Sequence, residues 1–250
     1  MGEDVMKKLL FFMVAVMLLS VAPAWAALLD LTAAGASGTI NGGYFLQVPD
    51  QSTGTGVIEP FVRIQANGTE QGYNTSNNAV PFDEKTGIWT HDLLLSAVPT
   101  KDIGGTIYRE FLLDINQTRG GTFLSLDELQ IYRGSTTSPN TTNVGSLGTL
   151  VYDLDIGVDG ESYIKLNYLL NPGSGAGDMF AYIPETAFAG AGPNDYVYLY
   201  SLFGSNFPSD DGFEEWAIVG TSVPVPIPAA AWLLGSGLLG LVAIRRRVKK

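Results

Sequence analysis

The sequence predicts an all-β protein: a single β-sandwich or jelly-roll-like body, preceded by an N-terminal signal peptide and followed by one C-terminal transmembrane helix. Three observations predict this arrangement. The 250 residues include 30 Gly and 13 Pro, and only 16% are charged, a composition that disfavours helical bundles and coiled coils. Apolar and polar residues alternate over many short stretches bounded by turn-forming residues. Each end of the chain combines basic residues with an uninterrupted apolar run.

Residues 1–26 are predicted to be a signal peptide. Two lysines precede an apolar run over residues 9–19, and Ala24 and Ala26 supply the small-residue pattern of a cleavage site. The apolar run is too short to cross a bilayer comfortably, so we expect cleavage after Ala26 rather than a permanent anchor. Met6 is an alternative start, because the acidic residues before it weaken the usual positive charge of this region.

Residues 27–222 are predicted to form the exported domain. Period-two alternation is the commonest pattern there, and no long helical periodicity competes with it. For example, Ile107, Phe111 and Leu113 fall on one side of a predicted strand. The predicted strands cover residues 43–48, 61–66, 87–95, 106–117, 126–132, 150–158, 161–170, 196–203 and 214–219. Residues 134–148, rich in Ser, Thr and Asn, are predicted to be an exposed loop.

The charge and composition of this domain exclude several functions. Between residues 27 and 222 there are 23 acidic and 7 basic residues, a net charge of −16, so no nucleic acid is expected as a partner. The chain has no Cys, which excludes a thiol nucleophile and a Cys-ligated zinc site. It has only one His, so a Ser-His-Asp triad is disfavoured. His91 lies among apolar residues of a predicted strand, so we expect a packed, hydrogen-bonded histidine rather than a general base.

Three aspartates are the candidate metal ligands: Asp153, Asp155 and Asp159. Carboxylates at alternate positions can converge on calcium, and the negative domain favours a cation. The EF-hand pattern fails, however, because Gly157 and Ile164 stand where it needs an acidic residue or Asn and the closing Glu. Calcium is therefore a candidate cofactor, and the alternative is that the aspartates lie on a solvated strand face.

Three tyrosines alternate on one predicted strand: Tyr196, Tyr198 and Tyr200. Exposed on one face, their rings would form a platform on which sugar rings stack. The alternative is that they fill the gap between the two sheets, with each hydroxyl reaching a partner. The opposite face carries Val197, Leu199 and Phe203, so either face is able to be the buried one.

A cluster of acidic residues could supply the carboxylate pair of a glycosidase. Its members are Asp210, Asp211, Glu214 and Glu215. Acidic residues beside Gly212 are more typical of a solvated turn that leads into a strand, and we therefore assign no catalytic residues.

Residues 223–250 have the pattern of a membrane tail. The 16 residues from 229 to 244 carry no charge, which corresponds to about 24 Å of helix. With the apolar, Pro-containing stretch before them, they are long enough for a thin transmembrane span. The Arg cluster that follows should stay cytoplasmic by the positive-inside rule, so the body would lie on the outer side of the inner membrane.

This tail resembles the PEP-CTERM sorting signal, which joins a Pro-Glu-Pro element, a membrane helix and an Arg-rich end. Here Pro226, Ile227 and Pro228 take the place of the first part, and residues 232–244, beginning at Trp232, take that of the second. The third part is Arg245, Arg246 and Arg247. Ile227 departs from the usual Glu. The resemblance implies processing by an exosortase, a membrane-embedded protease-transpeptidase of Gram-negative bacteria that make exopolysaccharide.

Phrases of the body such as LSLDELQIY and LVYDLD are similar to those of a β-rich group of PEP-CTERM proteins, and this similarity implies no reaction. The sequence therefore favours a non-enzymatic protein that is anchored transiently in the inner membrane and then delivered to the cell surface or secreted. Its expected role is structural or adhesive in the extracellular matrix, in contact with exopolysaccharide. The alternatives are a calcium-dependent carbohydrate-binding module and, third, a carboxylate-based glycan hydrolase.

Overall fold

The computed structural model describes residues 28–49, 58–117, 120–155, 162–173, 175 and 177–219. The described residues belong to one compact unit that ends at Val219. Several predicted features lie outside these ranges: Ala24, Ala26, Asp159, Pro226, Ile227, Pro228, Trp232, Arg245, Arg246 and Arg247. Within the described ranges the helices are short 3-10 turns, and none has the length and apolarity of a membrane span.

The first sheet is built from five strands in the order β1, β12, β10, β14 and β6. Strand β1 pairs with β12 in parallel, and the other neighbours are antiparallel. Two further strands join it, β11 on β10 and β7 on β14. Their bounds are β1 Leu28–Asp30, β6 Glu70–Tyr73, β7 Leu93–Leu94, β10 Phe123–Gly134, β11 Thr149–Asp153, β12 Tyr163–Asn167 and β14 Tyr196–Phe203.

The second sheet is antiparallel, with the order β2, β3, β13, β9, β16 and β4, and β8 pairs with β9. Its strands are β2 Ser37–Ile40, β3 Gly43–Gln47, β4 Ile58–Ile64, β8 Thr100–Ile103, β9 Thr106–Asp114, β13 Met179–Pro184 and β16 Glu214–Val219. A small third sheet joins β5 to β15. The remaining elements are β5 Asn67–Gly68, β15 Ser209–Asp210, and the 3-10 turns η1 Leu95–Ala97, η2 Val144–Ser146, η3 Tyr168–Leu170 and η4 Glu185–Phe188.

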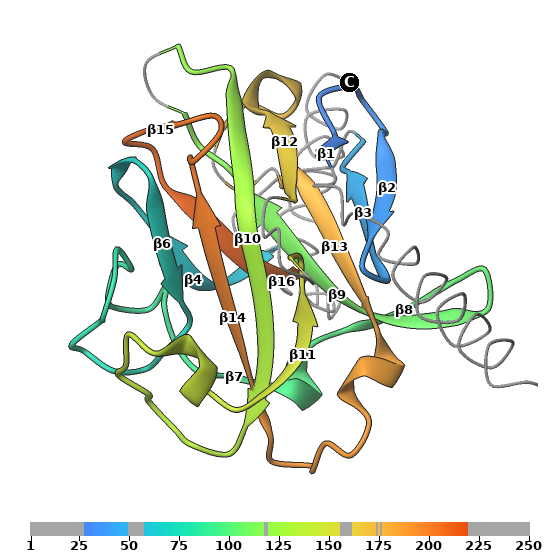
Figure 1. Ribbon diagram of the computed structural model, residues 1–250, viewed down its shortest axis with the longest axis vertical. Helices are drawn as coiled ribbons and strands as arrows, with labels where there is room; N and C mark the ends of the chain where they lie inside the picture. The colour runs from blue at the N-terminus through green and yellow to red at the C-terminus, as the bar shows by residue number, and fades with distance from the viewer. Residues whose placement is uncertain are drawn as a thin grey trace, which may run out of the picture. The chain divides into compact units, whose positions relative to one another are not determined.

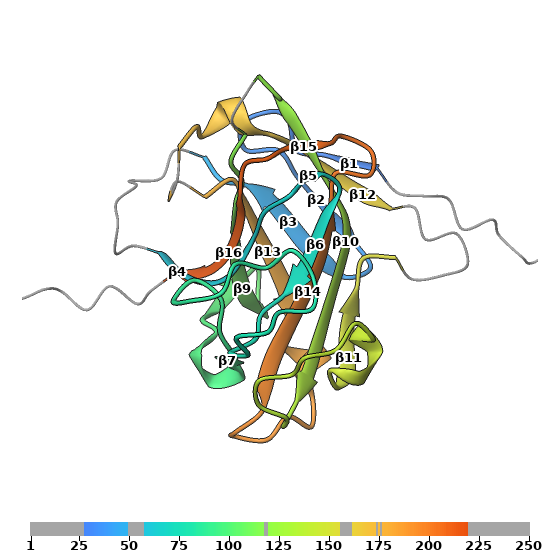
Figure 2. The same cartoon turned by 90° about the vertical axis from the view of Figure 1, so that its left-hand side faces the viewer.

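The two large sheets face each other and enclose one apolar core (Figures 1 and 2). In Figure 2 they stand as separate layers, with β16, β9 and β13 in one and β6, β14 and β10 in the other. Alternate residues of each strand enter the core, for example Phe111 and Leu113 of β9 and Leu129 and Ile131 of β10. The prediction of an all-β fold is confirmed, and two packed sheets agree with a β-sandwich.

One predicted strand is wrong. Of residues 87–95, only Leu93–Leu94 forms a strand. Gly87 has a φ of 111° and its carbonyl accepts a hydrogen bond from Thr90, so the chain turns here instead of extending. In the predicted strand 161–170, the last residues also turn, because the Asn167 side chain accepts a hydrogen bond from the Leu169 amide and begins η3.

Strand β13 was not predicted because its sequence does not alternate. Met179 and Ala181 lie in the central core, whereas Phe180 and Tyr182 lie in a second apolar cluster on the outer face of the second sheet. A strand that is buried on both faces has a continuous apolar sequence, which periodicity alone does not separate from other buried segments.

Candidate functional site

The three predicted platform tyrosines lie on the outer face of the first sheet. Tyr198 is 0% exposed and Tyr200 is 5% exposed, while Tyr196 is half-buried. Neither sequence-based alternative therefore describes them. They do not form an exposed three-ring platform, and the gap between the sheets is filled by the opposite face of β14, with Val197, Leu199 and Phe203. Tyr73 and Tyr132 belong to the same outer cluster, and the ring of Phe82 packs against it.

The loop of residues 134–148 covers the outer tyrosine cluster, and its backbone is hydrogen-bonded to the tyrosine hydroxyls. The Tyr198 hydroxyl donates to the carbonyl of Thr136, and the Tyr73 hydroxyl accepts a hydrogen bond from the Thr141 amide at 3.0 Å. Leu147 packs on the same rings and is buried. Residues 134–148 form the predicted loop and most of them are exposed, while Leu147 and the hydrogen-bonded backbone of Thr136 and Thr141 pack over the sheet.

Asp153 is the last residue of β11, and Asp155 lies two residues beyond it. Asp153 Oδ1 accepts a hydrogen bond from the Asp155 amide at 2.8 Å, and Asp155 Oδ1 accepts one from the Ser162 amide at 2.8 Å. Burial raises the pKa of both carboxyl groups. Asp159, the third predicted ligand, lies outside the described residues.

The Glu128 carboxyl group lies near those of Asp153 and Asp155, and no sequence pattern indicated it. Burial, together with the charges of Asp153 and Asp155, raises its pKa to about 7. Strand pairing brings the residues together, since Gln130 of β10 lies opposite Asp153 of β11. Across the described part of the chain, no group of three or more acidic, His or Cys side chains is arranged to hold a metal ion. A calcium site here would therefore need ligands such as Asp159.

The four acidic residues around Gly212 are separated by the structure. Asp210 lies in β15, and Asp211 adopts a left-handed turn conformation with a φ of 73°. Glu214 and Glu215 are both buried, so the expectation of a solvated turn is wrong for them. Because they are consecutive on β16, they point to opposite faces of the sheet and do not form a carboxylate pair with each other.

Glu215 faces outward and is paired with Arg63 of the neighbouring strand β4. The Arg63 guanidinium lies 2.6 Å from a Glu215 carboxylate oxygen and stacks 4.4 Å from the ring centres of both Trp89 and Phe213. The aromatic rings on both sides restrict the guanidinium to one position. This arrangement fixes a charge pair on the sheet rather than leaving a free acid for catalysis.

A pair of buried aspartates lies on the same outer face, near the glycines Gly173, Gly175 and Gly177. The Gly175 amide donates to Asp114, and the Ile115 amide donates to Asp178 at 2.8 Å. Burial raises the pKa of Asp114 to about 6 and that of Asp178 well above its usual range. Asp114 thus holds Gly175 at the end of β9, whereas Asp178 holds the backbone of Ile115, the residue that follows this strand.

Glu214 faces inward and meets Glu70 of the opposite sheet. The two residues are 0% and 1% exposed. Burial is the main reason that the pKa of each carboxyl group is raised, and the pKa of Glu214 is raised well above its usual range. The sequence analysis named Glu214 as part of a turn but gave no signal for Glu70, which is distant along the chain and reaches Glu214 only when the sandwich closes.

His91, the single histidine, is half-buried, and its Nδ1 lies 2.9 Å from the carbonyl oxygen of Asp92. This agrees with the predicted hydrogen-bonded histidine. The ring lies in the turn before β7 and not within a strand, because residues 87–92 do not extend.

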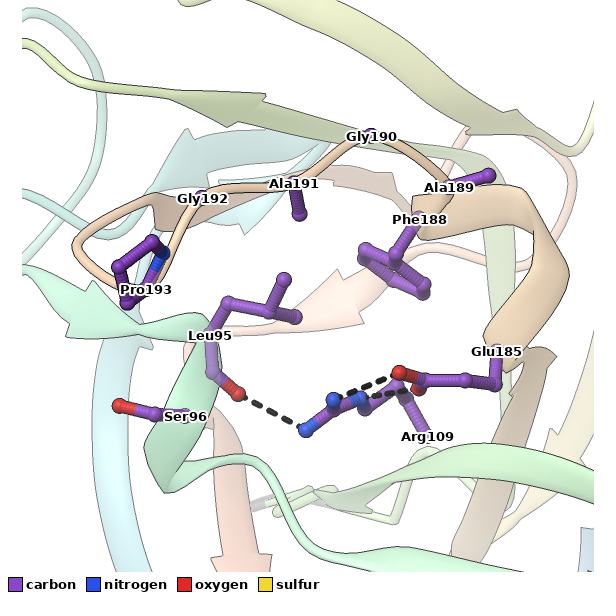
Figure 3. A pocket seen from close by; sticks show the side chains of 10 residues that line it. All are labelled: Leu95, Ser96, Arg109, Glu185, Phe188, Ala189, Gly190, Ala191, Gly192 and Pro193. Carbon is purple, nitrogen blue, oxygen red and sulfur yellow. Dashed lines mark hydrogen bonds and ion pairs between the residues drawn. The ribbon is translucent and has the colours of Figure 1, made fainter.

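An open pocket of about 440 Å³ lies beside η1 and η4 (Figure 3). Leu95 and Phe188 provide its apolar side, and the small residues 189–193 form its rim. On its floor Arg109 pairs with both carboxylate oxygens of Glu185 and also donates to the carbonyl oxygen of Leu95 at 2.9 Å. The acid and the base of this pocket are thus engaged with each other and join η1 to η4.

No protein-family model, curated protein or solved structure matches this chain. Its function is therefore inferred from its own residues.

Proposed function

We propose that this is an exported, non-enzymatic protein with a jelly-roll-like body, delivered to the cell surface or the extracellular matrix through an exosortase-type system. Its role there is structural or adhesive and linked to exopolysaccharide. The proposal rests on the C-terminal sequence, in which Pro226-Ile227-Pro228, an apolar stretch and three consecutive arginines follow one another. The N-terminal sequence adds a signal-peptide pattern.

The arrangement of the described acids and tyrosines supports a role without catalysis. Glu214 and Glu215 point to opposite faces of β16, Arg63 engages Glu215, and Asp114 holds a backbone turn. The body also has no Cys, so an oxidising or a reducing compartment leaves its covalent structure unchanged.

The experiment is mass spectrometry of the mature protein from its native host. We expect a mass that lacks residues 1–26 and the Arg-rich end, because the signal peptidase and the exosortase each remove one segment. Replacing Arg245, Arg246 and Arg247 together by Gln should leave the tail attached, whereas replacement by Lys keeps the positive charge and serves as the matched control. A secreted protein that retains its Arg-rich end would refute the sorting proposal.

A calcium-dependent carbohydrate-binding module is the second candidate. The crowding of Glu128, Asp153 and Asp155 favours it, because each of the two aspartates raises the pKa of Glu128 and a bound cation would relieve that repulsion. The predicted third ligand, Asp159, follows on the same segment of chain.

Thermal melting of the full chain in mild detergent tests this candidate. The measurement belongs above the pKa of Glu128, at about pH 8, where its carboxylate is ionised. Millimolar calcium should raise the Tm by several degrees, since a ligand that binds the folded state stabilises it. Asp153→Asn should abolish the shift, and Asp102→Asn, a change in an exposed hairpin of the second sheet, should keep it. An unchanged Tm of the unaltered protein in calcium would exclude the site.

A further inference from the structure

Two glutamates from opposite sheets meet inside the sandwich at one edge. Glu70 begins β6, the outermost strand of the first sheet, and Glu214 begins β16, which pairs with the outermost strand β4 of the second. Both side chains point into the interior and are buried. Glu70 Oε1 and both carboxyl oxygens of Glu214 are buried and receive no hydrogen bond from another residue that the structure describes. The two carboxyl groups lie close enough to act on each other, so a hydrogen bond between them is the one available to these oxygens.

The other groups around this pair give it no positive charge. Glu70 Oε2 accepts a hydrogen bond from the Ala66 amide at 2.5 Å, and the Ser209 hydroxyl of β15 also interacts with Glu70. On the other side, the Asn116 amide faces Glu214. The charged groups that act on the pair, Asp83 and Asp210, are both acidic, and none of the ion pairs among the described residues includes either glutamate.

A hydrogen bond between two carboxyl groups requires a proton, because one oxygen must donate an O–H group to the other. Loss of that proton would leave two carboxylates in contact in a medium of low dielectric constant, with no counter-ion. Each would then lack the hydrogen bonds that water gives a charged carboxylate, and the two would repel each other.

The backbone segments at this corner are closely packed against one another. A methyl group on Gly212 would lie 1.6 Å from the carbonyl oxygen of Asn116, and one on Gly204 would lie 2.0 Å from that of Gly68. The chain segments that carry and flank the pair are therefore in direct backbone contact. Close packing leaves the two side chains little room to separate, so we expect the repulsion to be relieved by opening of the edge.

We propose that the Glu70–Glu214 pair is a proton-dependent latch between the two sheets, which holds the β6 and β16 edge closed in acid and releases it as the pH rises. The folded state binds a proton that the unfolded chain releases near the ordinary pKa of glutamate. Stability from the latch is therefore present at low pH and is lost as the pH rises above that value. The small sheet of β5 and β15, next to the pair, would loosen with it.

The test compares the full chain in mild detergent with its Glu214→Gln variant at about pH 5.5 and about pH 8.5. The Gln amide is able to donate a hydrogen bond to Glu70, but it does not ionise in this pH range. Urea unfolding gives the global stability, and hydrogen exchange read by mass spectrometry, corrected for the intrinsic pH effect, gives local opening. Glu59→Gln, at an exposed position of β4, is the matched control.

We expect protection of β6 and β16 in the unaltered protein to fall at least about tenfold more than that of β3 and β13 between these pH values. The Glu214→Gln variant should lose this difference, and the Glu59→Gln variant should keep it. If Glu214→Gln does not fold, Glu70→Gln replaces it with the same expectation. Equal protection of the edge at both pH values, or the full pH effect in the Gln variant, would overturn the latch. Recovery of protection at high pH by millimolar calcium would overturn it in favour of a cation.

Discussion

Asn74 shows how one side chain takes the place of a missing stretch of strand. It is fully buried, its Nδ2 donates to the carbonyl oxygen of Val197 at 2.8 Å, and its Oδ1 accepts a hydrogen bond from the Leu199 amide at 2.7 Å. Strand β6 covers the edge of β14 only from Tyr200 onward, and β7 covers it only up to Val197. The Asn74 amide therefore completes the hydrogen bonds of β14 between the two short strands.

Replacing Asn74 by Ala should lower the free energy of unfolding by roughly 2–4 kcal/mol, because a buried carbonyl and a buried amide of β14 would both lose their partners. Urea unfolding of the full chain measures the change. Asn67→Ala, at an exposed position of β5, is the control and should cost less than about 1 kcal/mol. Equal stability of the two variants would show that water replaces the Asn74 amide.

Single residues were predicted well where their environment is local and poorly where it is not. The hydrogen bond of His91 is made to the next residue, and the sequence analysis anticipated such a contact. Glu214 was interpreted as part of a solvated turn because Gly212 and two aspartates precede it. Its burial depends on Glu70 and on the closure of two sheets, which no local pattern records.

At the scale of elements, alternation was the reliable signal. Strands β14 and β16 have the bounds predicted for them, residues 196–203 and 214–219. Which face of β14 would lie between the sheets could not be predicted, since both faces are apolar and a loop far along the chain covers the outer one. Short strands such as β5 and β7 give too few residues for a period to be recognised.

The turn before β16 should tolerate no side chain at Gly212. Its φ is not in the left-handed region, so Gly212→Ala carries little backbone strain, but the added methyl group would collide with the Asn116 carbonyl. We expect a loss of about 2 kcal/mol or more in the free energy of unfolding. Gly145→Ala is the matched control, because its new methyl group would have its nearest neighbour at 3.4 Å.

Differential scanning fluorimetry of both glycine variants gives the comparison. Gly212→Ala should melt several degrees below the unaltered chain, and Gly145→Ala should stay within about one or two degrees of it. An unchanged Tm for Gly212→Ala would mean that the backbone at Asn116 moves away from residue 212 with little loss of stability.

At the scale of the whole molecule, acidic residues outnumber basic ones by 23 to 7 between residues 27 and 222. Among the residues that the structure describes, Arg63, Arg109 and Arg133 are already in ion pairs. The remaining acidic charge repels itself and opposes the compact state.

Added salt should therefore stabilise the protein. Raising NaCl from about 20 mM to about 300 mM shortens the screening distance, and we expect the Tm to rise by a few degrees. KCl at the same concentration should act equally, since screening depends on ionic strength and not on the ion. A fall in Tm would show that the ion pairs outweigh the repulsion.

The position of β16 bears on when the chain is able to fold during the export that we propose for it. This last described strand lies between β9 and β4, so the long ladder of β4 is incomplete until residues 214–219 have arrived. Pairing between segments so distant in the chain is slow and comes late in folding. During secretion from the N-terminus, the domain would thus remain unfinished, and fit for threading through a narrow translocation channel, until almost all of its residues had crossed.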